Sequence, residues 1–198
     1  GFIEDHEAPP VMKKVLAFEI ADTTVTNREF KAFIDATGYT TTAETIGDSY
    51  VFHLLVEPEK RAEYAHVSGS PWWLLVPGAS WNHPTGPQSS IDDMMDHPVV
   101  HVSLQDALAY CDWAKVKLPT ETQWEYAARG GTTSQFPWGN DLEEDGEFHA
   151  NTWQGDFPNT NTKADGFLGT APVKSFEPNG YGLYQMIGNV WEWCCNHR

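Results

Sequence analysis

The sequence predicts one loop-rich α+β domain, and three observations support this fold class. Hydrophobic residues make up 40% of the 198 residues and aromatic residues 13%, which is enough apolar surface for one core of ordinary size. The 16 glycines and 13 prolines indicate many turns and long irregular connections. Helical patterns are confined to three segments, and the last third of the chain shows none. We therefore expect a single domain over residues 1–198 with little regular secondary structure.

The charge and the apolar pattern argue against nucleic-acid binding and membrane insertion. With 12 Lys and Arg against 28 Asp and Glu, the net charge is −16, and the chain lacks clustered cations that would neutralise phosphates. No run approaches the roughly 20 apolar residues that cross a bilayer, and residues 1–10 carry no apolar signal segment. Three cysteines cannot make a disulfide framework, so we expect reduced thiols in a cytoplasmic protein.

The first half of the chain begins with a predicted strand and a predicted helix. Residues 12–25 alternate loosely and are rich in β-branched side chains, which predicts a strand ending near Asp22. Thr26 and Glu29 form a capping box for a helix that Gly38 ends. Residues 39–91 show little periodicity, so we expect a long irregular segment there, pinned by its aromatic side chains.

Two further helices are predicted in the second half. An extended segment at residues 97–103 leads to Ser103 as the cap of one helix, and Thr120 with Gln123 caps the next, which ends at residues 130–131. After that, we expect turns separated by short apolar runs. The first of these two helices should bury one apolar face, which would place its cysteine in the core; the face comprises Leu104, Ala107, Leu108, Cys111 and Ala114.

His97 and His101 form a pair of candidate metal ligands. They are four residues apart, Pro98 argues against a helix across them, and in a strand they would lie on the same side. The spacing matches part of the H-x-x-x-H-x-E iron motif of ergothioneine-type sulfoxide synthases, but Ser103 stands where that motif has Glu. The pattern therefore favours structural histidines, with a metal site as the alternative.

The adjacent pair Cys194 and Cys195 leaves several interpretations open. It can be a nucleophile, a site for a soft metal, a vicinal disulfide or two reduced thiols. Hydrolase and nucleotide-binding functions lack their usual support, because no G-x-S-x-G, P-loop, G-x-G-x-x-G or H-E-x-x-H pattern occurs.

Two stretches rich in oxygen ligands are candidate sites for a hard cation. The second runs from Gln185 to Glu192, where residues 188–189 bend the chain. Short carboxylate and amide side chains with exposed carbonyls suit Ca²⁺, although the same residue types are ordinary turn formers and no EF-hand spacing is present. The first stretch carries Asn151, Asp156, Asn159, Asn161 and Asp165, followed by a turn at residues 166–167.

Six blocks along the chain form a recognisable pattern. They are Gly-Asp-Ser-Tyr-Val-Phe at residues 47–52, Trp-Trp-Leu-Leu-Val-Pro-Gly-Ala at 72–79, Asp-His-Pro-Val-Val-His-Val-Ser at 96–103, Leu-Pro-Thr-Glu at 118–121, Phe-Pro-Trp-Gly-Asn at 136–140 and Gly-Asn-Val-Trp-Glu-Trp at 188–193. Together they resemble the formylglycine-generating enzymes, also called sulfatase-modifying factors, over nearly the whole chain.

This resemblance implies a compact fold related to C-type lectins and an oxygen-dependent reaction assisted by Cu(I). The reaction converts the cysteine of a C-x-P-x-R peptide in an unfolded sulfatase polypeptide to Cα-formylglycine. The resemblance also implies a peptide groove and two structural calcium sites. The groove matches Asp48, Ser49, Trp72 and Trp73; the first calcium site matches Asn151, Asp165 and the carbonyls of Thr152 and Phe167; the second matches Gln185, Glu192 and the carbonyls of Gly188 and Val190.

Several positions depart from the family pattern. The family's two copper-binding cysteines lie C-terminal to the Gly-Asn-Val-Trp-Glu-Trp block, and Cys194 and Cys195 stand too early to match them. We therefore assign no catalytic residue and expect the domain to be incomplete at its C-terminus. Gln185 replaces a common Asn, and Ala128 replaces a disulfide cysteine of secretory members, which favours a cytoplasmic location.

Three other interpretations accompany this one. The main alternative function is a non-catalytic, calcium-stabilised lectin-like binding module or inactive paralogue. An iron-dependent sulfoxide synthase would additionally require a separate helical domain. For the groove, the alternative is that Trp72 and Trp73 only fill space beneath the long loop.

Overall fold

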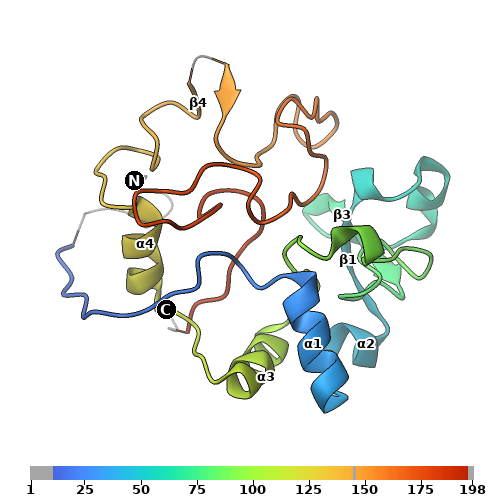
Figure 1. Ribbon diagram of the computed structural model, residues 1–198. Coiled ribbons are helices and arrows are strands. Elements are labelled where there is room, and N and C mark those ends of the chain that lie inside the picture. The colour runs from blue at the N-terminus through green and yellow to red at the C-terminus, as the bar shows by residue number, and fades with distance from the viewer. Residues whose placement is uncertain (1–10, 145, 196–198) are drawn as a thin grey trace.

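A computed structural model describes residues 11–144 and 146–195 (Figure 1), so the expectation of no signal segment at residues 1–10 lies outside the described residues. The elements are, in chain order, helices α1 (Asn27–Thr37) and α2 (Thr42–Ile46), strand β1 (Asp48–Phe52), 3₁₀ helices η1 (His53–Leu55) and η2 (Pro58–Glu63), strands β2 (His66–Val67) and β3 (Ser70–Pro77), 3₁₀ helix η3 (Asp92–Met94), helices α3 (Leu104–Ala114) and α4 (Glu121–Arg129), and strands β4 (Glu143–Glu144) and β5 (Glu147–Phe148).

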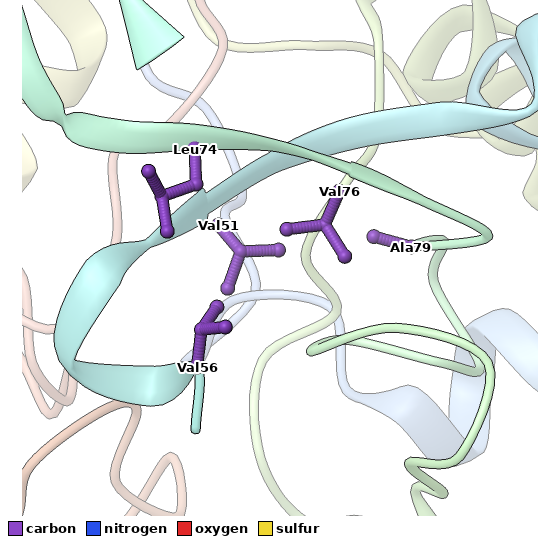
Figure 2. Packing of buried hydrophobic residues seen from close by; sticks show 5 residues of the cluster. All are labelled: Val51, Val56, Leu74, Val76 and Ala79. Carbon is purple, nitrogen blue, oxygen red and sulfur yellow. The ribbon is translucent and has the colours of Figure 1, made fainter. Parts of the chain in front are cut away.

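The main sheet has three antiparallel strands in the order β1-β3-β2. The register pairs Val51 with Leu74 and Ser49 with Val76, so these residues share one face of the sheet. Figure 2 shows Val51, Val56, Leu74, Val76 and Ala79 packed together in the buried cluster under this face. Helices α1, α2 and α3 lie toward the same side of the molecule as the sheet, whereas α4 lies with the C-terminal loops (Figure 1).

The capping signals locate the helices as expected. In α1, the Thr26 hydroxyl accepts from the Glu29 N–H, the Glu29 side chain accepts from the Thr26 N–H, and Gly38 ends the helix in the left-handed conformation. In α4, Thr120 and Gln123 form the same reciprocal pair. The predictions for these two helices are confirmed, including the end of α4 at Gly130.

Asn179 closes the C-terminus of α4 from a distant part of the chain. Its Nδ2 donates to the carbonyls of Ala127 and Ala128, which are among the last acceptors of the helix (2.8 and 3.2 Å). Its Oδ1 accepts from the N–H groups of Tyr181 and Leu183. A side chain at position 130 would collide with this loop, which explains why a glycine stands there. The hydrogen bonds of the Asn179 side-chain amide therefore attach the C-terminal loops to α4.

Asp106 joins α1, α2 and α3 from a fully buried position. Its Oδ2 accepts from the Ser103 N–H, completing the capping box of α3. Its Oδ1 accepts from the Tyr39 hydroxyl and from the Thr42 N–H at the start of α2. Burial and the Asp106 carboxylate raise the pKa of Tyr39, which keeps that hydroxyl protonated as a donor. One carboxylate thus joins the start of α3 to the segment after α1 and to the start of α2.

Two expectations for the first half of the chain were wrong. Residues 12–25 form no strand, since they make only isolated bonds to distant loops, such as Tyr184 N–H to the Asp22 carbonyl, and have no partner strand. The segment at residues 39–91 is not one irregular loop, because it contains α2 and the whole three-stranded sheet. The Trp-Trp-Leu-Leu-Val run of β3 lacks the alternation that identifies a half-exposed strand, so its pattern did not predict the sheet.

The predicted apolar face of α3 was also partly wrong. Cys111 is buried as expected, but Leu108 is exposed. The helix instead turns Asp106 and Tyr110 inward, and the Tyr110 ring packs against Phe30 and Phe33 of α1. The hydrogen bonds of Asp106 fix this rotation in place of the aliphatic stripe.

The last third of the chain consists mainly of turns, as expected. Its regular structure, within the described residues, is the short hairpin of β4 and β5. No helix of the described chain is long and apolar enough to cross a membrane.

Replacing Asp106 should destabilise the fold strongly. In Asp106→Ala, the Tyr39 hydroxyl and two backbone N–H groups lose their buried acceptor, so we expect a loss of about 3 kcal/mol in the free energy of unfolding. Asp112 on the same helix is exposed and forms only a surface ion pair, so Asp112→Ala should cost about 0.5 kcal/mol or less. Urea denaturation measures both, and equal losses would contradict the role given to Asp106.

Candidate functional site

The predicted groove residues lie on the paired strands β1 and β3. Because opposed residues share a face and successive residues of a strand point to opposite faces, Asp48 lies on the same side of the sheet as Phe52 and Trp73. Ser49 lies on the opposite side with the buried Val51. The structure therefore places the predicted groove residues in one sheet, with Asp48 and Ser49 facing opposite ways.

An aromatic surface connects the sheet to both oxygen-rich stretches. Phe52 contacts Trp73, Trp153 and Phe157, with ring centroids 5.6, 5.5 and 6.1 Å apart. The ring of Trp72 also contacts that of Phe157, and the ring of Trp73 contacts that of Trp191, with centroids 5.1 and 6.2 Å apart. We define the aromatic surface as Phe52, Trp72, Trp73, Trp153, Phe157 and Trp191.

Part of this aromatic surface faces solvent. Trp191 is 93% exposed and Phe157 51% exposed. Leaving such large apolar rings in water is unfavourable, and exposed aromatic clusters are typical of binding surfaces. Trp72 and Trp73 are themselves half-buried, so their role in a peptide groove stays a prediction beside the interpretation in which they only fill space.

The Ser49 hydroxyl is hydrogen-bonded to the imidazole of His101. The imidazole Nε2 lies 2.8 Å from the Pro84 carbonyl, which can only accept, so Nε2 carries the proton. Nδ1 is then an acceptor, and the Ser49 hydroxyl donates to it over 2.8 Å. Burial lowers the pKa of His101, which keeps the ring neutral and preserves this direction. His101 adopts a left-handed φ of 58°, turning the chain so that the ring reaches both partners.

The first oxygen-rich stretch folds around Asp165. Its Oδ2 accepts from the Thr152 N–H and its Oδ1 from the Phe167 N–H, both at 3.0 Å. Asn151 lies beside them, linked through the Gly169 carbonyl and Asn189. The structure thus brings Thr152, Asp165 and Phe167 together, with Asn151 next to Thr152 in the chain, and the Thr152 carbonyl accepts from the Gln154 side chain. Asp156 and Asn159 are exposed and hydrogen-bonded to each other, apart from this group.

The second oxygen-rich stretch shows an unpaired ligand. Gln185 is buried, and its Nε2 donates to the Pro172 carbonyl, but its Oε1 has no partner among the described residues. Glu192 is half-buried, and its carboxylate accepts from the Trp124 indole N–H at 3.0 Å. Burial raises the pKa of Glu192, partly opposed by that hydrogen bond. No hydrogen bond in the described chain joins Gln185 to Glu192, so their meeting at one ion stays a prediction.

The donor sets of both stretches fit calcium. Ca²⁺ binds carboxylate, amide and carbonyl oxygens at about 2.3–2.6 Å. The buried and unpaired Oε1 of Gln185 would be satisfied by such contact, and a cation would favour the charged form of Glu192. In the first stretch, the Asp165 carboxylate, the Asn151 amide oxygen and the carbonyls of Thr152 and Phe167 supply oxygen ligands only.

The remaining candidates do not form a metal centre. His97 binds the Thr170 hydroxyl and His101 binds Ser49 and Pro84, so the two rings have separate structural partners. No group of three or more His, Cys, Asp or Glu side chains in the described residues is arranged to hold a metal ion. Cys194 and Cys195 are free thiols, and burial raises the pKa of Cys194.

Some important residues were not singled out by sequence reasoning. Trp153 and Phe157 lie between the sheet and the Asp165 loop, but their only sequence signal was a high local density of aromatic residues. Asn189 looked like a turn former, yet its side chain bonds to both Asn151 and Ala171. That role depends on contacts 18 or more positions away along the chain, which no local pattern encodes.

The fold and the site define a loop-rich domain of the sulfatase-modifying type. The family model for the sulfatase-modifying factor enzyme 1-like domain matches residues 2–197, and the chain belongs to this family. A solved relative, the structure of PvdO from Pseudomonas aeruginosa, has a TM-score of 0.55 and 28% identity over 88% of this chain and 55% of that chain.

Curated relatives include both active and inactive proteins. A formylglycine-generating enzyme of Thermomonospora curvata is 53% identical over 197 residues, which is 99% of this chain and 65% of the relative. The inactive Cα-formylglycine-generating enzyme 2 of Mus musculus is 46% identical over 191 residues, which is 96% of this chain and 61% of the relative. The chain thus spans less than two thirds of the length of either protein.

Acidification should weaken the fold through His101. Its folded pKa lies below the ordinary value of about 6.5, so the unfolded chain binds more protons once the pH falls below that value. Stability is then lost as the pH falls through this window toward the folded pKa. His101→Asn, which tolerates the left-handed φ, should show a smaller loss between about pH 7.5 and about pH 5.5.

Urea unfolding at the two pH values measures this loss. Burial also lowers the pKa of His97, so His97 contributes to the loss of stability with falling pH in every variant. The effect of His101 is therefore the difference in this loss between the wild type and His101→Asn. His66→Asn, at an exposed position, is the matched control. An equal loss in His101→Asn and in the wild type would contradict the prediction.

Chelation of calcium should lower the melting temperature. An ion that binds only the folded state, present at a free concentration of about 100 times its Kd, stabilises the fold by about 2.7 kcal/mol. For a chain of this size, that raises the melting temperature by several degrees. Asp165→Asn should reduce the shift, and Asp156→Asn, an exposed carboxylate in the same stretch, should leave it unchanged. Thermal melts with EDTA and with restored Ca²⁺ measure the effect. An unchanged melt after exhaustive chelation would remove both calcium assignments.

Proposed function

We propose that this domain binds an extended sulfatase peptide bearing C-x-P-x-R and presents its cysteine for oxidation by O₂ to Cα-formylglycine. The observation that carries this proposal is the aromatic surface, which joins the β1–β3 sheet to the loops of residues 151–167 and 185–192. About half-identical relatives named as formylglycine-generating enzymes support the reaction class.

The geometry of the sheet suits an extended peptide. β1 is an edge strand, so within the described residues one side of its backbone has no strand partner. An extended peptide can gain main-chain hydrogen bonds along such an edge and place alternate side chains in apolar contacts. The proline of the peptide motif would pack on the exposed rings of Trp191 and Phe157.

Charge also favours this ligand. The chain carries a net charge of −16, and Asp48 lies on the same face of the sheet as Phe52 and Trp73. A carboxylate on this face of the sheet is a suitable partner for the arginine of the motif. Asp48 is thus the residue that we propose to select the arginine.

The described residues contribute binding and orientation. The aromatic surface excludes water from the peptide, and the calcium loops hold Trp153 and Trp191 in place. Copper would supply the oxygen chemistry through two thiolates, but no residue of the described chain is assigned to it, because Cys194 and Cys195 stand too early in the sequence to match the family's copper-binding pair. The free thiols are compatible with the proposed cytoplasmic location.

A second function is a calcium-stabilised binding module without catalysis. The 46% identity to an inactive paralogue supports this alternative. Both functions use the aromatic surface, so they are separated by turnover and not by binding.

Peptide binding tests the surface, and peptide mass tests the reaction. A labelled C-x-P-x-R peptide should bind the wild type, and Trp73→Ala should weaken binding by at least about tenfold, as expected for a buried aromatic contact worth about 2 kcal/mol. Trp113→Ala on α3 is the matched control, because Trp113 is part of the separate cluster around Phe33. Asp48→Asn should weaken binding only for peptides that retain arginine.

Three results would decide between the functions. Binding with a mass change of the cysteine in the presence of Cu(I) and O₂ supports the enzyme. Binding without turnover supports the binding module. Equal binding by the wild type and Trp73→Ala would remove the aromatic surface from both.

A further inference from the structure

Asn189 makes four hydrogen bonds, of which two connect the candidate calcium loops through Asn151 and two reach Ala171, between the loops in the sequence. Its Oδ1 accepts from the Asn151 amide at 3.0 Å and from the Ala171 N–H at 2.8 Å. Its Nδ2 donates to the Ala171 carbonyl, and its backbone N–H donates to the Asn151 carbonyl at 2.9 Å. We call these bonds the Asn189 clasp. All of the polar groups involved belong to loops with no sheet or helix to hold them.

The clasp fixes which atom of Asn151 is free to bind a cation. The Ala171 N–H can only donate, so the Asn189 atom that it meets is an oxygen. The Asn151 atom between this oxygen and the Gly169 carbonyl must therefore be the amide nitrogen. Both hydrogens of that nitrogen are used, so the Asn151 Oδ1 points elsewhere and remains available as a ligand.

The same residue stands inside the second loop. Asn189 lies between Gly188 and Val190, whose carbonyls are the predicted ligands of the second calcium site. Gly188 has a φ of 77° and Asn189 a φ of 60°, a bend that sets the direction of these carbonyls. Gly188 also packs directly against the Asn151 carbonyl, so closely that a Cβ would not fit. The two loops therefore cannot change shape independently.

From this geometry we infer that Asn189 couples the two cation sites, so that filling either site raises the affinity of the other. The inference rests on the calcium sites of the proposed function. A cation in the Asp165 loop orders Asn151, and Asn151 orders the bend at residues 188–190 through the clasp. The second cation then binds a loop that is already ordered, so its binding loses less conformational entropy. Linkage requires the same factor in the reverse direction.

Calcium titration by calorimetry of the chelated chain and two single-site variants tests the coupling. Asp165→Asn disables the first site, and Glu192→Gln disables the second. The site remaining in each variant should bind Ca²⁺ about tenfold more weakly than the second of two ions binds the wild type, a factor typical of coupled sites. The wild-type isotherm should be cooperative, and its overall constant for two ions should exceed the product of the two single-site constants by about tenfold.

Asn189→Ala tests whether the clasp carries the coupling. In this variant the two ions should bind with little cooperativity, and the added Asp165→Asn change should no longer weaken the second site. Asn159→Ala, which removes an exposed amide bonded only to Asp156, is the matched control and should stay cooperative. The comparison of Asp165→Asn with Glu192→Gln does not depend on the folding of Asn189→Ala.

The outcomes separate this inference from the calcium assignment. Two ions that bind independently in the wild type would overturn the coupling while leaving both sites in place. Cooperative binding that persists in a folded Asn189→Ala would overturn the role of the clasp. Absence of any Ca²⁺ binding would overturn the sites and the coupling together.

Discussion

The candidate site depends most on the hydrogen bonds of the Asn189 side-chain amide. The loops at residues 151–167 and 185–192 contain no regular element, so side chains must satisfy their backbone groups. Asn189 does so for Asn151 and Ala171 at once. Through this contact the loops that carry Trp153 and Trp191 are held to each other, and the two rings meet the sheet at Phe52 and Trp73.

The helices of this domain were the most predictable part of the fold, because their signals are local. Each α-helix begins with a capping box, and those of Thr26 and Thr120 were evident in the sequence. The predicted Ser103 cap is confirmed as well, and Asp106 completes its box. The box of Thr41 was not identified, since α2 has only five residues. The oxygen-rich loops were predicted for the same local reason, as clusters of short polar side chains.

The sheet and the aromatic surface could not be predicted in the same way. β3 is apolar on both faces, so alternation gave no signal, and its partner β1 lies about 20 residues earlier. The rings of Phe52, Trp73, Phe157 and Trp191 come from four separate segments. Family resemblance supplied Trp72 and Trp73, whereas Trp153 and Phe157 became visible only when tertiary packing placed them beside Phe52.

Attachment by amide side chains has a consequence for the chemical ageing of this domain. Asn179 is followed by Gly180, a sequence in which asparagine readily loses its amide to become aspartate. In the folded chain both ends of the amide are engaged, with the nitrogen on the carbonyls of α4 and the oxygen on two backbone N–H groups. Deamidation would set a carboxylate oxygen against those carbonyls and prevent the contact from re-forming. The rate at which the protein loses this contact by deamidation therefore depends on how often the loop at Asn179 opens.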